Sequence, residues 1–570
     1  MRVAVTQMCV EEDILTMPTV PGIRVSAAGL LATACVMLAT TPVDAAGAIK
    51  VDVDAARVIA TVPELYNVGY NGWGDITYPT AVASLNDVQV KYCRIVAQLR
   101  ELCGDRPGDY RWEYVTPPDQ GLGFVSRIRK LIENGWTPII AFSLHGGYAD
   151  LPRWFHGENN DQATKAWFRY NGDGSAAADG NGDQYGALTR IAHATVAKLA
   201  AEGLKGLCWE TIYEMGAEMP LAEIHYHVAR GIRDGDASAT IMGPATWPGW
   251  TVEERFLKPY LAKYGPELLD YVSLHWYGSG DHELWALGFK PETDIVTMAD
   301  RKYLEYLLSM TPKYALWTQS LRTLLDDRAL NPSGKHIGIA YTEFDVVAQS
   351  PYQRNPENPA WPDYDPAADC YVNSNVYGGV WSASVLCNLA AQGKADVVCK
   401  FNARNYYGLI DNGLEKTYYR QPVWFAWKLL QQRAGMKRGA TMISARVEAT
   451  AGPSEAEVFA IGDAGRPRVI LINKSFRSCT AESSVLNLTS GAWVVTRYLY
   501  DPSRTARFIG RKPGSAAEGT FEGAPAADSK NAVSLLPADS FTVHADGGAL
   551  RLPVVTCPPL SITVLAFERG

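Results

Sequence analysis

The chain has 570 residues, of which 47% are hydrophobic and 20% are charged, and this ordinary composition excludes a disordered or fibrous protein. The formal net charge of -8 makes nucleic acid and anionic membranes poor partners. The 16 Trp and 29 Tyr residues suit large cores as well as flat surfaces on which sugars stack.

The first element along the chain is a run of small apolar residues over 25–40, directly after Arg24. This run is too short and too rich in alanine for a transmembrane span, and small residues at Val43, Ala45 and Ala46 fit a signal-peptidase site. We therefore expect residues 1–46 to be a signal peptide and the protein to be secreted or periplasmic. An anchoring helix, or a lipid attached at Cys35, is the alternative.

Between residues 62 and 440, short apolar runs alternate with helix-like segments. The helix-like segments include 122–134, 189–202, 221–234 and 375–393, several of them followed by glycine. Eight runs are typical of buried strands: 66–72, 89–96, 137–144, 206–214, 240–245, 271–278, 336–345 and 397–403. This alternation predicts an α/β fold, a (β/α)8 TIM barrel. A doubly wound sheet is the alternative, but no Gly-x-Gly-x-x-Gly turn follows the first strand.

From residue 441 to residue 570 the pattern changes to short alternating strands separated by Gly, Pro, Ser and Asp. The predicted strands are 457–461, 468–473, 493–500, 540–544 and 561–567. This pattern is typical of an all-β sandwich. Residues 47–61 alternate in the same way, so we expect them to join that sandwich.

The cysteines lack the spacing of a zinc site. Cys93, Cys208 and Cys399 lie in apolar runs and are expected to be buried thiols. Cys479 and Cys557 both fall in the β-rich region and could pair in an oxidising compartment.

Two carboxylates are predicted at the ends of barrel strands, where sites in this fold are built. Glu214 lies at the end of the fourth strand and Glu343 near the end of the seventh, across the barrel mouth. Cleavage of an acetal needs an acid for the leaving oxygen and a carboxylate that attacks C1 or activates water. The pair therefore indicates a glycosidase.

Segments 206–220, 240–246, 271–278 and 336–345 resemble the strand signature of glycoside hydrolase clan A. They are similar to the family 39 and family 51 group of β-xylosidases and α-L-arabinofuranosidases. The motifs of that group run roughly W-E-x-x-N-E, S-x-H-x-Y and T-E-F/W, and here they read WETIYE, SLHWY and TEF. The resemblance covers most of 62–440 and extends to a sandwich built from both ends of the chain.

The resemblance implies roles for individual residues in a two-step, retaining reaction. Glu214 would be the acid/base and Glu343 the nucleophile, with Tyr277 bonded to that nucleophile. His275 would line the pocket of the sugar that is attacked. Arg94 would keep the nucleophile ionised, because a neighbouring guanidinium lowers the pKa of a carboxyl group. A shifted alignment that makes Glu210 or Glu218 the acid is the alternative, although Glu210 lies within its strand.

Two departures from the family pattern bear on the substrate. Tyr213 stands where the family has an Asn that contacts the sugar 2-hydroxyl, so we expect a sugar that differs at C2. The Trp expected on the eighth strand is missing, and Phe401 or Lys400 takes its place, beside Asn402 as a candidate for substrate binding.

Aromatic residues in or near strand-end loops are further candidates for sugar stacking: Trp73, Trp154, Trp276 and Trp361. Trp381, Trp424 and Trp427 lie in helical segments and are expected in the core. Residues 179–185 resemble the start of a calcium loop but lack its Gly and final Glu, so a polar loop is favoured.

The sequence thus predicts a secreted retaining glycoside hydrolase that acts on a plant, algal or microbial polysaccharide or oligosaccharide. The alternatives are an endo-acting hydrolase of a sulfated or uronic-acid galactan and a non-catalytic carbohydrate-binding barrel. Neither metal nor cofactor is expected, because two carboxylates supply the whole reaction. We expect a carbohydrate substrate and neither nucleic acid nor membrane as partner.

Overall fold

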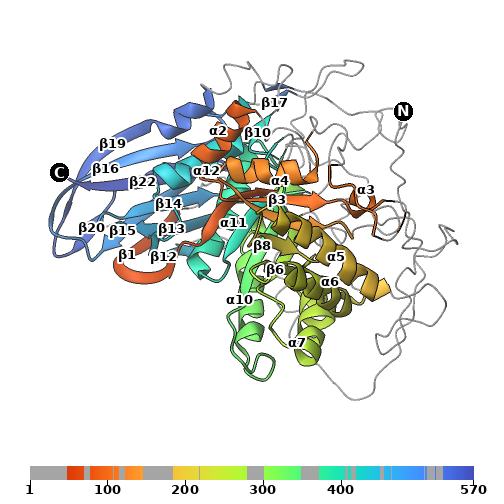
Figure 1. Cartoon of the computed structure of the whole chain (residues 1–570). Coiled ribbons are helices and arrows are strands. Elements are labelled where there is room, and N and C mark those ends of the chain that lie inside the picture. The colour runs from red at the N-terminus through yellow and green to blue at the C-terminus, as the bar shows by residue number, and fades with distance from the viewer. Residues whose placement is uncertain are drawn as a thin grey trace. The chain divides into compact units, whose positions relative to one another are not determined.

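The computed structural model describes residues 48–69, 78–104, 106, 108–113, 122–144, 184–216, 219–278, 301–347, 372–404, 408–411, 419–449, 455–463, 465–505, 508–509, 520–521 and 530–570. Several predictions lie outside these residues: the signal peptide over 1–46, Trp73, Trp154, Trp361, Glu218 and the acidic part of the calcium-like loop, 179–183. Residues 47–570 form one compact unit (Figure 1).

Eight parallel strands close into a barrel, which confirms the predicted fold class. All eight lie where the apolar runs predicted them. Their bounds are β2 (Glu64–Gly69), β3 (Tyr92–Ala97), β4 (Thr137–Phe142), β5 (Cys208–Glu210), β6 (Thr240–Thr246), β7 (Tyr271–Tyr277), β8 (Gly338–Asp345) and β9 (Val397–Lys400). The strands are nearly continuous buried runs because the helices cover their outer face.

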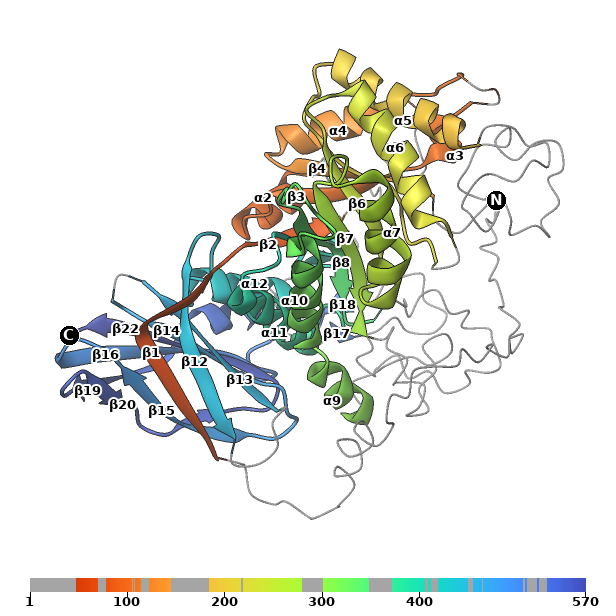
Figure 2. The same cartoon turned by 90° about the horizontal axis from the view of Figure 1, so that it is seen from below.

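The helices run outside the barrel, and amphipathic ones such as α4 and α6 bury their apolar side against it (Figure 2). Gly135 and Gly203 have φ of 88° and 82° just after two predicted helices, as helix-ending glycines should. The bounds are α2 (Pro79–Asp87), α3 (Leu99–Leu102), α4 (Phe124–Glu133), α5 (Gln184–Ala201), α6 (Leu221–Gly235), η3 (Thr251–Leu257), α7 (Lys258–Tyr264), α9 (Arg301–Ser309), α10 (Lys313–Asp326), α11 (Val376–Gln392) and α12 (Pro422–Gln432). None of the helices in the described part of the chain has the length and apolar character needed to cross a bilayer.

A second sheet of ten strands is built from the C-terminal region together with β1, as the sequence predicts. Its hydrogen-bonded order is β19-β16-β22-β14-β13-β12-β1-β15-β20, with β21 also paired to β15. The bounds are β1 (Ala48–Thr61), β12 (Thr441–Ala449), β13 (Ala456–Gly462), β14 (Arg468–Asn473), β15 (Cys479–Leu486), β16 (Gly491–Tyr500), β19 (Pro537–Ala545), β20 (Ala549–Arg551), β21 (Val555–Cys557) and β22 (Ser561–Arg569). The sequence predicts a sandwich of two sheets. In the structure its strands form one continuous sheet, which curls around a hydrophobic core of its own.

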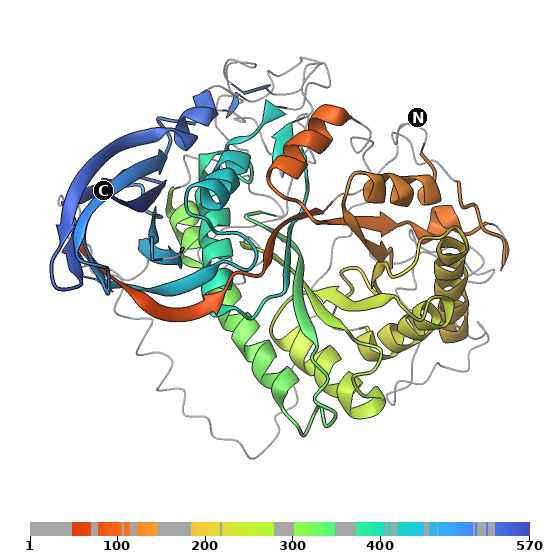
Figure 3. The same ribbon diagram turned by 60° about the vertical axis from the view of Figure 1, so that its left-hand side comes forward.

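Strand β1 occupies an interior position in this sheet. It pairs antiparallel with β12 from Ile49↔Ala449 to Thr61↔Thr441, and parallel with β15 from Ala48↔Thr480 to Asp54↔Leu486. Figure 3 shows this red strand running along the blue strands of the C-terminal region. The segment that leads into the barrel therefore holds two parts of the second sheet together.

A buried polar cluster joins the second sheet to the barrel helices. Glu457 of β13 accepts hydrogen bonds from Lys474 (2.8 Å) and from Asn388 of α11 (3.2 Å), as well as from Ser384. Lys474 also donates to Thr311 at 3.3 Å. Trp381, Trp424 and Trp427 on α11 and α12 are almost fully buried, as predicted for core residues.

Candidate active site

Glu343 lies on β8 inside the barrel, with its side chain only 1% exposed. Both of its carboxylate oxygens have partners. Arg94 donates to Oε1 at 2.6 Å, and the hydroxyl of Tyr277 donates to Oε2 at 2.7 Å. The parallel register of β7 and β8 sets His275 directly beside Glu343. Charge-assisted bonds of this kind hold a carboxylate in one orientation.

Arg94 on β3 is itself fixed by a second carboxylate. Its Nε donates to Glu210 of β5 at 2.6 Å, and all three side chains are essentially excluded from solvent. Burial opposes the charge on Arg94, but Glu210 and Glu343 raise its pKa well above the ordinary arginine value. The guanidinium is therefore a permanent cation between two buried carboxyl groups.

Glu214 comes four residues after the end of β5 and reaches the same region from a strained backbone. Its φ of 51° is unusual for a residue with a side chain, and its backbone N–H donates to the carbonyl of Ala245 at the end of β6, at 3.0 Å. The side chain is 17% exposed, in contrast to the enclosed Glu343. Glu214 is thus partly exposed, whereas Glu343 is almost fully buried.

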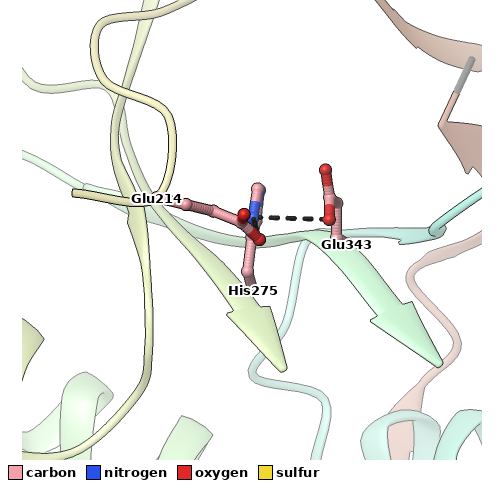
Figure 4. A group of neighbouring side chains, drawn as sticks. All are labelled: Glu214, His275 and Glu343. Atoms are coloured by element: carbon pink, nitrogen blue, oxygen red, sulfur yellow. Dashed lines mark hydrogen bonds and ion pairs between the residues drawn. The ribbon is translucent and has the colours of Figure 1, made fainter. Parts of the chain in front are cut away.

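His275 on β7 stands between the two glutamates (Figure 4). Its Nδ1 lies 2.9 Å from Oε1 of Glu214 and 3.5 Å from Oε2 of Glu343. One atom from each of the three residues lies within 4.8 Å of the other two. Both carboxyl groups therefore converge on one nitrogen of the His275 ring.

The hydrogen bonds around His275 locate a proton. The single hydroxyl hydrogen of Thr342 goes to Glu210 at 2.6 Å, so its oxygen accepts from Nε2 of His275 at 3.1 Å. Nδ1 of a neutral His275 then lacks a hydrogen, and its 2.9 Å contact with Glu214 needs one. One proton is therefore held between Glu214 and His275. Both oxygens of Glu343 already accept hydrogen bonds, from Arg94 and Tyr277, so this proton is not required there.

The pKa of Glu343 reflects opposing causes. The net pKa is about 7. Burial is the largest cause of the rise and the charge of Glu214 adds to it, whereas His275, Arg94 and the bond from Tyr277 lower the pKa. The sequence predicts the direction of the Arg94 effect. The net shift is nevertheless upward, because the removal of Glu343 from water outweighs its partners.

Tyr213 packs directly against two residues of the site. Its ring lies over the guanidinium of Arg94, 4.7 Å from the centroid, and edge-on to His275 at 5.7 Å between ring centroids. Burial raises the pKa of the Tyr213 hydroxyl, and the charges of Glu343 and Glu214 raise it further. The aromatic ring therefore covers one face of Arg94 next to the carboxylate pair.

The prediction for Trp276 is wrong. Side chains alternate along a strand, so the residue between His275 and Tyr277 points away from the mouth and toward the helices. Trp276 is 7% exposed in the hydrophobic core, and its ring centroid lies 4.6 Å from that of Trp317 on α10.

Of the two residues expected in place of the missing tryptophan, Phe401 is the one that contacts a site residue. Its ring packs edge-on against Tyr277 with 5.5 Å between centroids. Lys400 instead forms a buried ion pair with Asp345 at 2.6 Å. Asn402 is 6% exposed and accepts a bond from the backbone of Arg404 at 3.3 Å, so its substrate role stays a prediction.

The sequence does not predict the roles of two residues of the site, Glu210 and Thr342. The sequence suggests Glu210 only as an alternative acid, whereas in the structure it is fully buried and bonded to Arg94 and Thr342, which suits an anchor better than a proton donor. The signal for Glu210 was its charge in an otherwise apolar strand, which requires a buried partner. A lone Thr such as Thr342 carries no comparable signal.

The cluster of Glu214, His275 and Glu343 has the ligand types that a divalent cation accepts. Its surroundings favour proton chemistry instead. Both oxygens of Glu343 are already bonded, and the adjacent Arg94 would repel a second cation.

Searches among protein-family models and among curated proteins found no match. Solved structures do match. A family 51 arabinofuranosidase from Xanthomonas axonopodis pv. citri has a TM-score of 0.56 at 13% identity, over 91% of this chain and all of that one. A family 51 α-L-arabinofuranosidase from Bifidobacterium longum has a TM-score of 0.54 at 14% identity, over 93% of this chain and all of that one.

A monomeric β-xylosidase from Caulobacter crescentus CB15 is similar to the same degree, with a TM-score of 0.54 at 15% identity over 91% of this chain and 99% of its own. Identities this low carry the arrangement of the backbone and not the chemistry. The chain therefore has the barrel-and-sheet fold of clan A glycoside hydrolases of the family 51 and family 39 type.

Proposed function

We propose that the protein is a retaining glycoside hydrolase in which Glu214 is the acid/base and Glu343 the nucleophile. The observation that carries this proposal is the convergence of the two carboxyl groups on His275, with cluster atoms within 4.8 Å of one another. Carboxyl groups of retaining enzymes are about 5–5.5 Å apart, whereas inverting pairs are about 6.5–9.5 Å apart to admit a water molecule.

The environments of the two glutamates suit different tasks. In the first step, an oxygen of Glu343 attacks C1, the bond from C1 to the leaving oxygen breaks, and the proton held at Glu214 passes to that oxygen. In the second step, Glu214 takes a proton from water, the water oxygen attacks C1, and the ester bond to Glu343 breaks. Arg94 and Tyr277 hold Glu343 in position for both steps.

The substrate class is a plant polysaccharide or an oligosaccharide derived from it, cleaved outside the cytoplasm. The names of the similar structures, arabinofuranosidase and β-xylosidase, support pentose-containing substrates as the first to try. The convergence of two intact carboxyl groups weighs against a non-catalytic binding barrel, which has no use for a proton held between Glu214 and His275.

The test compares two variants on aryl glycosides with good and poor leaving groups. Glu343→Ala should lose turnover of all of them, because no other group attacks C1. Glu214→Ala should lose about 10²–10⁴-fold on poor leaving groups and far less in the glycosylation step on good ones. Added azide should then accelerate release of the sugar from Glu214→Ala as a glycosyl azide.

The matched control is Glu202→Gln, which alters a 37% exposed carboxyl group in the turn directly after α5 and should leave turnover unchanged. Equal losses in both active-site variants on an activated substrate, with no effect of azide, would overturn the assignment. So would an inverted product anomer, detected by NMR during hydrolysis.

A further inference from the structure

Two tryptophans near the barrel mouth are exposed to solvent. Trp247 is 37% exposed and Trp250 is 62% exposed, whereas every other tryptophan in the described part of the chain is buried or partly buried. An indole left in water forgoes a large gain from burial, so two such rings within four residues make this edge a candidate binding surface.

These residues follow the carboxyl end of β6, which is bonded directly to the segment that carries Glu214. The carbonyl of Ala245 accepts from the backbone N–H of Glu214 at 3.0 Å, and the hydroxyl of Thr246 donates to the carbonyl of Met215 at 3.1 Å. Trp247 is two residues beyond Ala245, a separation that spans at most about 7 Å along the chain.

The local backbone keeps the two rings at this edge. Gly249 has a φ of 83°, which a residue with a side chain rarely adopts, and its carbonyl accepts from Glu253 at 2.9 Å to open the helical turn of η3. The guanidinium of Arg255, one turn later, lies 5.8 Å from the centroid of the Trp250 ring. The tight turn places Trp247 before the helix and Trp250 at its start, outside the buried face that Val252, Phe256 and Leu257 form.

The side of the site on which they lie determines what they meet. This inference rests on the proposed function, in which the proton of Glu214 passes to the leaving oxygen. The leaving group must therefore lie next to Glu214. The sugar that is attacked lies instead against Glu343 and its partner Tyr277. Residues joined to the Glu214 segment therefore border the leaving group.

We propose that Trp247 and Trp250 form a stacking platform for a neutral sugar ring in the leaving group. The apolar C–H face of a sugar packs on an indole, while its hydroxyl groups stay in water at an exposed surface. The preferred substrates are then glycosides whose leaving group is itself a sugar, which means a sugar–sugar bond in an oligosaccharide or polysaccharide.

The experiment uses the full chain and two substrates with one glycone: a glycosyl fluoride, whose leaving group cannot stack, and the trisaccharide that ends in the same sugar. The glycone is the one that wild-type protein cleaves fastest in a panel of nitrophenyl glycosides. In Trp247→Ala, the ratio of kcat/KM for the trisaccharide to that for the fluoride should fall at least tenfold. Trp250→Ala should lower it less, and Trp247→Phe should restore most of it.

The matched control is Leu316→Ala, which removes a 60% exposed apolar side chain from α10 and should leave the ratio unchanged. An unchanged ratio in both tryptophan variants would overturn the platform, and so would an equal loss on both substrates. If wild type cleaves no glycoside at all, the proposed function fails, and that outcome is distinct from failure of the platform.

Discussion

At the scale of single residues, Tyr213 is the feature that sets this site apart from the family it resembles. The tyrosine ring occupies the space over Arg94 and beside His275 that a smaller Asn would leave open. A sugar with an ordinary equatorial 2-hydroxyl would meet this ring where the family offers an amide.

We therefore expect unmodified β-xylosides to be poor substrates, and Tyr213→Asn to improve their kcat/KM relative to the best substrate of the wild type. Steady-state kinetics on nitrophenyl β-xyloside and on the selected substrate provide the measurement. Tyr213→Phe is the control, because it keeps the ring and should not improve the xyloside. Rapid cleavage of the xyloside by wild type, without improvement in Tyr213→Asn, would contradict this explanation.

The pH dependence of activity should report the environment of Glu343. The nucleophile must be ionised, and its pKa is raised to about 7, so kcat/KM should rise as the pH increases through about 7. The bond from Tyr277 lowers this pKa. Tyr277→Phe should therefore move the acidic limb of the pH profile to higher pH.

A suitable control is Tyr271→Phe, which alters a tyrosine at the opposite end of the same strand, β7. Its acidic limb should coincide with that of wild type. If the limb of Tyr277→Phe stays in place or moves to lower pH, the hydrogen bond does not stabilise the ionised Glu343.

The charged and aromatic residues of the site could be located from sequence because each lies near the end of a recognisable strand. Glu214, His275 and Glu343 are examples. Thr342 could not be located in this way, because its value lies in one hydrogen bond that exists only after β7 and β8 are in register. Trp276 was misplaced because a one-residue step along a strand reverses the direction of a side chain.

At the scale of elements, Cys479 and Cys557 lie directly opposite each other on β15 and β21. Opposed residues of antiparallel strands have Cα atoms about 4.5–5.5 Å apart, within the range that a disulfide spans. Both thiols are free in this structure. A hydrogen bond from Cys557 lowers the pKa of Cys479, which favours the reactive thiolate.

We predict that oxidised glutathione converts this pair to a disulfide, with release of two molecules of reduced glutathione, and that thermal stability then increases. The chain-entropy model gives about 4–5 kcal/mol for a loop of this length. Mass spectrometry of alkylated peptides identifies the bond, and a thermal melt measures its effect. Cys479→Ser should lose the increase; an equal increase in that variant would contradict the prediction.

Strands with strongly apolar sequences, such as β14 and β16, could be predicted from sequence, but β12 and β15 were missed. Segment 479–486 carries Thr, Glu and two Ser, so little in its composition indicates a strand. It is a strand because β1, β20 and β21 pair with it, which is a tertiary cause that local sequence does not contain.

At the scale of the whole molecule, β1 couples the start of the barrel to the interior of the second sheet. Val53 on β1 is fully buried in that sheet's own core, whereas Val58 on the same strand is 63% exposed. The two valines therefore provide a matched pair for a test of this coupling.

We expect Val53→Asp to lower the thermal midpoint strongly, because an unpaired charge buried in the core separates β1 from its neighbours. Val58→Asp should change the midpoint little. Because the buried cluster around Glu457 joins the sheet to the barrel helices, activity should be lost in the same transition as the sheet. Residual activity above the unfolding temperature of the sheet would show that the barrel stays folded without the sheet.

The interior position of β1 also constrains how the protein is made. Thr61 pairs with Thr441, which the ribosome adds 380 residues later. At about 5–20 residues per second, β1 waits roughly 20–80 s for its first partner. During this time the barrel strands emerge in order and can close, while β1 trails from them with both hydrogen-bonding edges uncovered. Assembly of the second sheet is then the last stage of synthesis, and the nascent chain is most open to aggregation through β1 until that stage is reached.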